Sequence, residues 1–122
     1  MKILLVDDSS TMRRIQKNTL TQLGLTDVDE AEDGEAAVAK VQATKSDLVL
    51  MDWNMPKMTG IDALKKIKAD PALKSVPIIM VTSESEKSRI IEAIQAGAAN
   101  YIVKPFQAET LQEKIQAITK GG

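Results

Sequence analysis

Residues capable of metal and phosphoryl chemistry follow short apolar runs at four separate points of the chain. They are Asp7 and Asp8, Asp52, the pair Thr82 and Ser83, and Lys104. Asp52 ends the apolar run 48–51, and Pro56 stops that run from continuing as a strand. A carboxylate at the tip of a buried strand is costly unless something pairs with it, binds it or reacts with it. The chemistry of the candidate site must therefore account for the charge on Asp52.

The three carboxylates predict a site for a divalent cation. Two carboxylates about 5 Å apart repel each other by roughly 3 kcal/mol at an effective dielectric constant near 20, so unpaired acids would destabilise the fold or raise their own pKa values. A small set of oxygen ligands, with room for water and a phosphoryl oxygen, suits Mg²⁺, with Mn²⁺ as the alternative. The pattern of an Asp-rich Ca²⁺ loop is absent from the sequence.

Lys104 and Thr82 add groups that can stabilise a transferring phosphoryl group. An ammonium and a hydroxyl can hold phosphoryl oxygens opposite the metal, and Asp52 between them is the natural nucleophile. Each residue alone also has a structural interpretation. Asp7, Asp8, Thr82 or Ser83 would be a helix cap, Lys104 a solvated lysine and Asn54 a turn residue. The functional interpretation depends on their convergence.

Composition excludes several other classes of function. The chain has no Cys and no His, which excludes thiol nucleophiles, imidazole bases, Ser-His-Asp triads, ordinary zinc sites and a histidine phosphate carrier. Net charge is −1 with acids and bases interspersed, so we expect no nucleic-acid binding. Four apolar residues before Asp7 are too few for a signal peptide, and no run has the length of a membrane span. We expect one cytoplasmic domain covering residues 1–122 and no membrane association.

Five strand–helix units must position these residues. The sequence predicts strands at Lys2–Val6, Asp27–Ala31, Asp47–Met51, Pro77–Val81 and Asn100–Val103, and helices at Thr11–Leu23, Gly34–Ala43, Ile61–Ala69, Glu86–Ala96 and Ala108–Thr119. Strict alternation predicts an α/β fold, a parallel sheet with helices on both faces, and five units are too few for an eight-fold barrel. Ligands of such sheets bind beyond the carboxyl ends of the strands, where the residues named above would meet.

The sequence resembles the receiver domains of two-component response regulators along essentially its whole length, and among them the single-domain chemotaxis regulators of the CheY type. The matching segments are Val6–Asp8, Ser10–Arg14, Ala31–Gly34, Asp52–Pro56, Met80–Thr82, Ala96–Ala98 and Tyr101–Phe106. The resemblance implies a flavodoxin-like, doubly wound (βα)5 fold with strand order 2-1-3-4-5. Such regulators are a standard example of that order, which is taken from the resemblance alone.

The resemblance also implies roles for individual residues. Asp52 would be the phosphoacceptor, with Mg²⁺ held by Asp7, Asp8, Asp52 and the backbone carbonyl of Asn54, and with Thr82 and Lys104 as partners of the phosphoryl group. Thr82 and Tyr101 would move on phosphorylation and reshape the face made by the fourth helix, fifth strand and fifth helix. Asn54 and Glu84 would tune hydrolysis of the aspartyl phosphate. The peptide bond before Pro105 is cis in such proteins.

Three features depart from the family pattern. Ser83 stands where Ala or Gly is usual, Thr59 replaces a common Asp, and the last helix is short. Ser83 could alter the access of water or donor to Asp52 and thus the lifetime of the phosphoryl group. The short helix could weaken the surface that binds partners.

We therefore expect a signalling switch, and not an ordinary enzyme, that catalyses its own phosphorylation and dephosphorylation. Implied partners are a chemotaxis-type histidine kinase, a flagellar motor switch protein and a phosphatase, and we expect a monomer. Three alternatives stay open: a flavodoxin-like electron carrier or binding module, a phosphatase with an Asp nucleophile after the first strand, and a receiver that binds partners without phosphorylation. Adjacent acids at 7 and 8 disfavour the first two, because they would repel a flavin phosphate and lack the Asp-x-Asp spacing.

Several other residues are expected to serve packing or solubility. We expect Trp53 to be a partially exposed packing residue without a chemical role. For Tyr101, half-buried packing at the sheet edge and a switching role are equally consistent with the residue itself. The pairs Arg13–Arg14 and Lys65–Lys66 are expected to lie on solvated helix faces.

Overall fold

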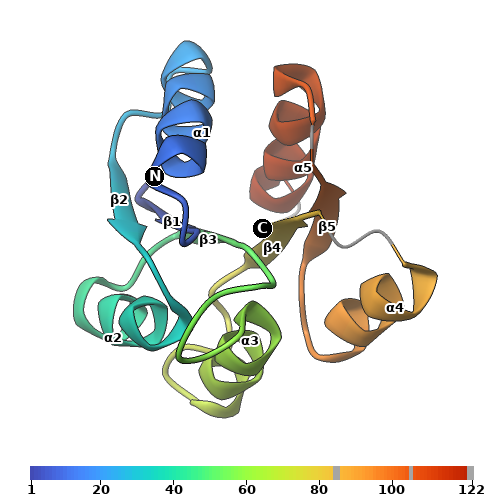
Figure 1. Ribbon diagram of the computed structural model, residues 1–122. Coiled ribbons are helices and arrows are strands. Elements are labelled where there is room, and N and C mark those ends of the chain that lie inside the picture. Colours follow the sequence, from blue (N-terminus) through green and yellow to red (C-terminus); the bar gives the residue numbers. More distant parts are fainter. Residues whose placement is uncertain (84–85, 105, 121–122) are drawn as a thin grey trace.

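Five parallel strands form one sheet in the order β2-β1-β3-β4-β5, as the resemblance implied. The computed structural model describes residues 1–83, 86–104 and 106–120. In this part of the chain the strands are β1 (Ile3–Val6), β2 (Val28–Ala31), β3 (Leu48–Met51), β4 (Ile78–Thr82) and β5 (Asn100–Val103). The helices are α1 (Ser10–Gln22), α2 (Gly34–Thr44), α3 (Gly60–Ala69), α4 (Lys87–Gln95) and α5 (Ala108–Lys120). Strands and helices alternate strictly, as expected (Figure 1).

Four strands begin one residue later than the sequence predicted. Three of the four preceding residues join the sheet through their carbonyl groups: Asp27 accepts a hydrogen bond from the N–H of Ile3 at 2.9 Å, and Pro77 accepts one from the N–H of Val49 at 3.0 Å. Lys2 likewise accepts from the N–H of Asp47 at 2.8 Å. The prediction was therefore wrong by one residue at these edges, because alternation of side chains does not show which backbone groups are paired.

Helices cover both faces of the sheet, as the alternation predicted. In Figure 1, α1 and α5 lie on one face, and α2, α3 and α4 lie on the other. Alternate residues of each strand enter two separate hydrophobic cores: in β1, Leu4 and Val6 face the α2–α3–α4 side, and Ile3 and Leu5 face the α1–α5 side. Burial on both faces explains why β1, β3 and β4 read as continuous apolar runs, whereas the edge strand β2 contains two acids and is mostly half-buried.

Two helices bury apolar residues that recur at helical spacing. Ile61, Leu64 and Ile67 of α3 are buried in the first core. Leu111 and Ile115 of α5 are buried in the second core, and Ile118 packs against it. The last helix has 13 residues, the same length as α1.

Side-chain caps start three of the helices. Ser9 accepts a hydrogen bond from the N–H of Met12 at 3.2 Å, and Asp33 accepts one from the N–H of Ala36 at 2.8 Å. Thr59, which departs from the family pattern, accepts one from the N–H of Asp62 at 3.3 Å. Thr is among the residues that cap helices well, so Thr59 suits the position before α3.

Two expectations about surface residues were wrong. Trp53 is only 3% exposed and belongs to the first core, where the Arg89 guanidinium lies 5.1 Å from its ring centroid. The Arg13 side chain is 16% exposed and bonded to other parts of the chain, while Lys65 and Lys66 are exposed as expected. Each correction involves a contact with a distant segment, which a local pattern does not contain.

No helix in the described part of the chain has both the length and the apolar character that a membrane span needs.

Candidate functional site

Backbone hydrogen bonds carry the strand pairing one residue beyond the strands and fix the candidate site residues at one edge. Asp7 N–H donates to Ala31 C=O at 3.1 Å, Asp52 N–H donates to Val6 C=O at 2.9 Å, and Lys104 N–H donates to Thr82 C=O at 2.8 Å. Strand order reverses at β1 and β3, the strands that precede Asp7 and Asp52. The residues therefore lie where ligands of open parallel sheets bind.

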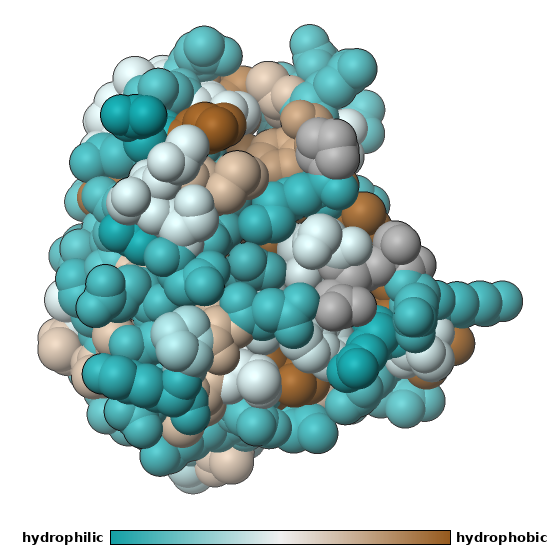
Figure 2. All heavy atoms as spheres, in the orientation of Figure 1, coloured by the Kyte–Doolittle hydropathy of each residue, from teal (hydrophilic) through white to brown (hydrophobic). Residues whose placement is uncertain are grey.

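Three carboxylates converge at this edge, as the sequence predicted. One oxygen from each of Asp7, Asp8 and Asp52 lies within 4.8 Å of the other two. Asp7 is 1% exposed and Asp52 is 8% exposed, whereas Asp8 is open to solvent. An all-oxygen cluster with one side open to water fits a small hard cation such as Mg²⁺. Figure 2 shows that hydrophilic residues predominate around the middle of this face of the molecule.

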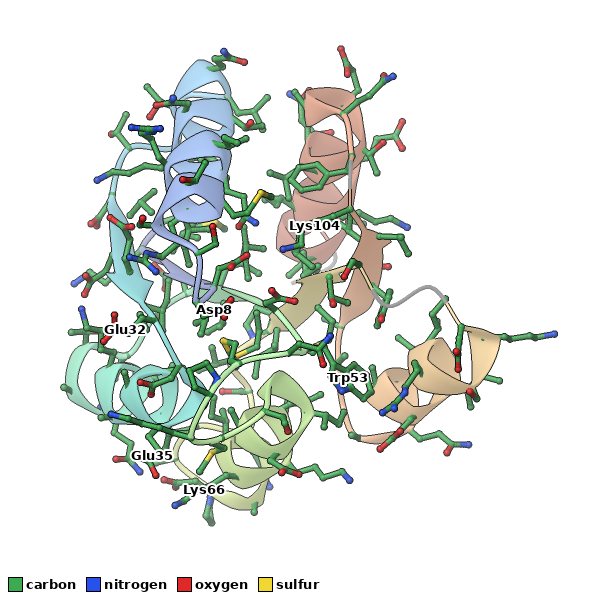
Figure 3. The ribbon with its side chains drawn as sticks, in the orientation of Figure 1. Asp8, Glu32, Glu35, Trp53, Lys66 and Lys104 are labelled. Atoms are coloured by element: carbon green, nitrogen blue, oxygen red, sulfur yellow. The ribbon has the colours of Figure 1, made fainter. Side chains whose placement is uncertain are left out.

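Lys104 pairs with two of these acids. Its Nζ lies 2.9 Å from Asp7 Oδ2 and 3.3 Å from Asp52 Oδ2, and its side chain is 13% exposed. Burial would by itself lower the pKa of Lys104, but the hydrogen bonds and charges of Asp7 and Asp52 outweigh it and raise that pKa. Lys104 is thus held as a cation beside Asp52. Figure 3 shows Lys104 and Asp8 near the centre of the same edge.

The environment of Asp52 acts against its negative charge. Burial raises its pKa above 3.8, and the neighbouring charge of Asp7 adds to that effect. The charge of Lys104 and hydrogen bonds from the Thr82 side chain and the Trp53 N–H act in the opposite direction. The Trp53 N–H donates to Asp52 Oδ1 at 2.7 Å, and Thr82 is completely buried. Without a cation, the site therefore makes ionisation of Asp52 less favourable than ionisation of an Asp in water.

The other predicted site residues lie close to this cluster in the chain. Asn54 is exposed in the loop after Trp53, and Tyr101 of β5 is buried against the first core. Ser83 is exposed directly after Thr82. Glu84 and the peptide bond before Pro105 lie outside the described residues.

The sequence did not indicate why glycine is needed at position 60. A Cβ on Gly60 would collide with the backbone carbonyl of Asp52, and the Gly60 N–H donates to Trp53 C=O at 2.8 Å. The start of α3 therefore packs directly on the backbone of the candidate nucleophile. The sequence alone does not reveal such a close approach of two backbones.

A second glycine holds the far end of the same loop. Gly34 N–H donates to Met58 C=O at 3.2 Å, and a Cβ on Gly34 would collide with Met58. Within this loop, the backbone of Lys57 is left-handed, with a φ of 65°. The Met58 N–H bonds to Pro56 C=O at 2.7 Å, the spacing of a three-residue turn. The loop after Asp52 is therefore fixed against both α2 and α3.

Comparison with known proteins gives a consistent family. The model of the response regulator receiver domain matches residues 3–116. The chain is 53% identical to chemotaxis protein CheY of Pseudomonas aeruginosa, over 97% of this chain and 95% of that protein. It is 54% identical to chemotaxis protein CheY1 of Helicobacter pylori, over 97% of this chain and 96% of that protein.

Solved structures agree with these relatives. A structure of a CheX–CheY–BeF₃–Mg²⁺ complex from Borrelia burgdorferi contains a chain that superposes with a TM-score of 0.92 at 29% identity, covering 98% of this chain and 89% of that one. The family model, the relatives and the solved structure therefore agree. The chain belongs to the response regulator receiver domain family of two-component signalling and, within it, to the chemotaxis regulators of the CheY type.

Proposed function

We propose that the chain is a Mg²⁺-dependent switch that accepts a phosphoryl group on Asp52 from a phosphohistidine of a chemotaxis histidine kinase. The observation that carries the proposal is the buried Asp52 carboxylate between two acids and the Lys104 ammonium. A purely structural ion pair would not need three carboxylates for one lysine. The excess negative charge fits a site completed by a divalent cation.

Asp7, Asp8 and Asp52 would hold the cation through carboxylate oxygens, with the Asn54 carbonyl as a further ligand. The bound cation would supply positive charge for the phosphoryl oxygens and lower the repulsion between the donor and the acids. Lys104, already held at 3.3 Å from Asp52 Oδ2, would stabilise the oxygens on the other side. The chain's own contribution is mainly to orient these groups before the donor arrives.

The proposed transfer forms one bond and breaks another. An oxygen of Asp52 attacks the phosphorus, the P–N bond of the phosphohistidine breaks, and its electron pair returns to the imidazole nitrogen. The product is an acyl phosphate on Asp52. Hydrolysis by water then restores the carboxylate and releases inorganic phosphate. Asn54 and Glu84 would tune that step, and Ser83 would affect the access of water to Asp52.

Phosphorylation would be read out on the surface of α4, β5 and α5. It adds roughly one negative charge and three acceptor oxygens, to which Thr82 and Lys104 can bond. Ile91 and Ile94 of α4 and Val103 of β5 are exposed large apolar residues on these elements. They offer a partner contact area, and a flagellar motor switch protein is the partner we propose. Because Tyr101 is already buried, switching would change its packing partners more than its exposure.

We also propose that the protein is a cytoplasmic monomer. It would meet its kinase, its output partner and a phosphatase in the cytoplasm. A receiver that binds partners without phosphorylation is the alternative that the following experiment separates.

Intact-mass spectrometry after incubation with phosphoramidate tests the proposal. Wild-type protein with Mg²⁺ should gain one phosphoryl group, and both EDTA and the substitution Asp52→Asn should abolish the gain. Asp62→Asn is the matched control, because it removes one exposed carboxylate of α3. Failure of the wild type to gain mass under any divalent cation would favour the phosphorylation-independent alternative.

A further inference from the structure

Arg13 of α1 reaches the backbone between the two acids that follow β1. Its Nη1 donates to the carbonyl oxygen of Asp7 at 2.7 Å, and its Nε donates to Glu30 Oε1 of β2 at 2.9 Å. The Asp7 carbonyl belongs to the peptide unit that joins Asp7 to Asp8. The orientation of this peptide unit therefore depends on a side chain from the next helix, anchored in turn on the edge strand.

The turn that carries the acids is tied to the same helix at further points. Asp7 Oδ1 accepts from the Ser9 N–H at 2.9 Å, and the Arg13 N–H donates to Ser9 C=O at 3.0 Å. Asp7 N–H is bonded to β2 through Ala31 C=O at 3.1 Å. These bonds fix Asp7. Asp8 is exposed, so the position of its carboxylate depends on the orientation of the peptide unit that Arg13 holds.

We infer that Arg13 is a positioning residue for binding of the divalent cation. Its hydrogen bond holds the Asp7–Asp8 peptide so that both carboxylates face the same point. This inference rests on the proposed function of the acidic cluster. The guanidinium bonds to a carbonyl and leaves the carboxylates of the cluster free for the cation. Its charge is paired with Glu30, whose other oxygen lies 3.8 Å from Lys17 Nζ. Arg13 thus orders the loop without competing for the ligands.

The charge of Arg13 and its positioning role predict opposite changes in Mg²⁺ affinity when Arg13 is replaced. A cation near a Mg²⁺ site repels the metal, so loss of its charge alone would leave the affinity unchanged or increase it. Loss of the bond to the Asp7 carbonyl would decrease the affinity, because groups that orient metal ligands typically contribute about tenfold or more. The sign of the change therefore separates the two effects.

Calorimetric titration of the metal-free protein with MgCl₂, at a temperature where every variant is folded, tests the inference. Arg13→Met, which keeps the apolar stem, should raise the Kd for Mg²⁺ by about tenfold. Arg13→Lys keeps the charge but lacks the fork that bridges Asp7 and Glu30, and should raise the Kd by a smaller factor. The matched control is Lys17→Met, which removes one positive charge from the same helix and one partner of the same Glu30 carboxylate. Its Kd should match that of the wild type.

The outcomes separate this inference from the proposed function. If Arg13→Met and Arg13→Lys bind Mg²⁺ as tightly as the wild type or more tightly, the positioning role is overturned while the metal site stands. An equal loss of affinity in Lys17→Met would also overturn it, because the Glu30 carboxylate shared by the two side chains, and not the bond to the Asp7 carbonyl, would then be responsible. If the wild type itself binds no Mg²⁺, the proposed function fails, and the positioning role fails with it.

Discussion

At the scale of single residues, the site is built around a carboxylate kept in an unfavourable place. The sequence predicted this, because Asp52 directly follows a run of strand length. It also predicted which acids and which lysine would meet Asp52, since the carboxyl ends of parallel strands share an edge. It did not predict the burial of Trp53 or the bonds of Arg13, because both depend on partners from distant segments.

Replacing Asp52 by Asn should stabilise the metal-free protein at neutral pH. Burial raises the pKa of Asp52 in the folded chain above 3.8, the ordinary value that applies to the unfolded chain. At pH values between 3.8 and the raised pKa, the folded chain therefore binds more protons than the unfolded chain. The free energy of unfolding therefore falls as the pH rises through this interval. Urea unfolding should give Asp52→Asn a larger free energy of unfolding than the wild type at neutral pH. This difference should shrink as the pH falls toward 3.8. If Asp52→Asn is less stable than the wild type at neutral pH, the charge of Asp52 does not destabilise the metal-free protein, and the prediction is wrong.

At the scale of secondary structure, the loop after Asp52 connects the site to three helices. It packs on the start of α3 through Gly60, on the start of α2 through Gly34, and on α4 through the stacking of Arg89 on Trp53. The alternation of elements and the apolar helix faces could be predicted from side-chain periodicity. The one-residue errors at strand starts and the loop contacts could not, because they depend on backbone pairing.

The substitution Gly60→Ala should disturb both stability and the site. The added methyl group collides with the Asp52 carbonyl, and relief requires a shift of the backbone that carries the nucleophile. We expect a loss of about 1–3 kcal/mol in the free energy of unfolding, together with weaker Mg²⁺ binding. Gly24→Ala is the control: Gly24 has a φ of 83° with open space around it, so this variant should lose stability but keep its Mg²⁺ affinity. Unchanged Mg²⁺ binding in Gly60→Ala would argue against the close packing described here.

The contact between Arg89 and Trp53 should be visible in fluorescence. Trp53 is the single tryptophan of the chain, so its emission reports this environment alone. Arg89→Gln removes the cation over the ring and should change the emission and lower the free energy of unfolding by about 0.5–1 kcal/mol. Lys87→Gln, on the same helix, serves as the control and should leave the emission unchanged. Identical spectra for Arg89→Gln and the wild type would show that the stacking does not persist in solution.

At the scale of the whole molecule, the sheet gathers residues almost a hundred positions apart, from Asp7 to Lys104, at one edge. Sequence periodicity predicted a parallel sheet covered on both faces, and this is confirmed. The strand order came from the family resemblance alone, because a right-handed crossover fixes the hand of each unit but leaves open which side of the sheet the next strand joins.

Mg²⁺ should stabilise the whole fold, because it binds the folded arrangement of acids and relieves their repulsion. Each tenfold excess of Mg²⁺ over its Kd should add about 1.4 kcal/mol to the free energy of unfolding. Thermal melts over a range of MgCl₂ concentrations should show this rise for the wild type and for Asp62→Asn. The rise should be reduced for Asp8→Asn. A melting temperature that is independent of millimolar Mg²⁺ would contradict the metal site.

The identity of the phosphorylated side chain is the central claim, and chemical trapping tests it most directly. Borohydride reduces an acyl phosphate to an alcohol, which converts a phosphorylated Asp to homoserine. After incubation with Mg²⁺ and phosphoramidate, reduction and peptide mass mapping should find homoserine at position 52 and unmodified Asp at positions 7 and 8. Homoserine at position 7 or 8, or an unmodified Asp52 in protein that has gained a phosphoryl group, would contradict the account.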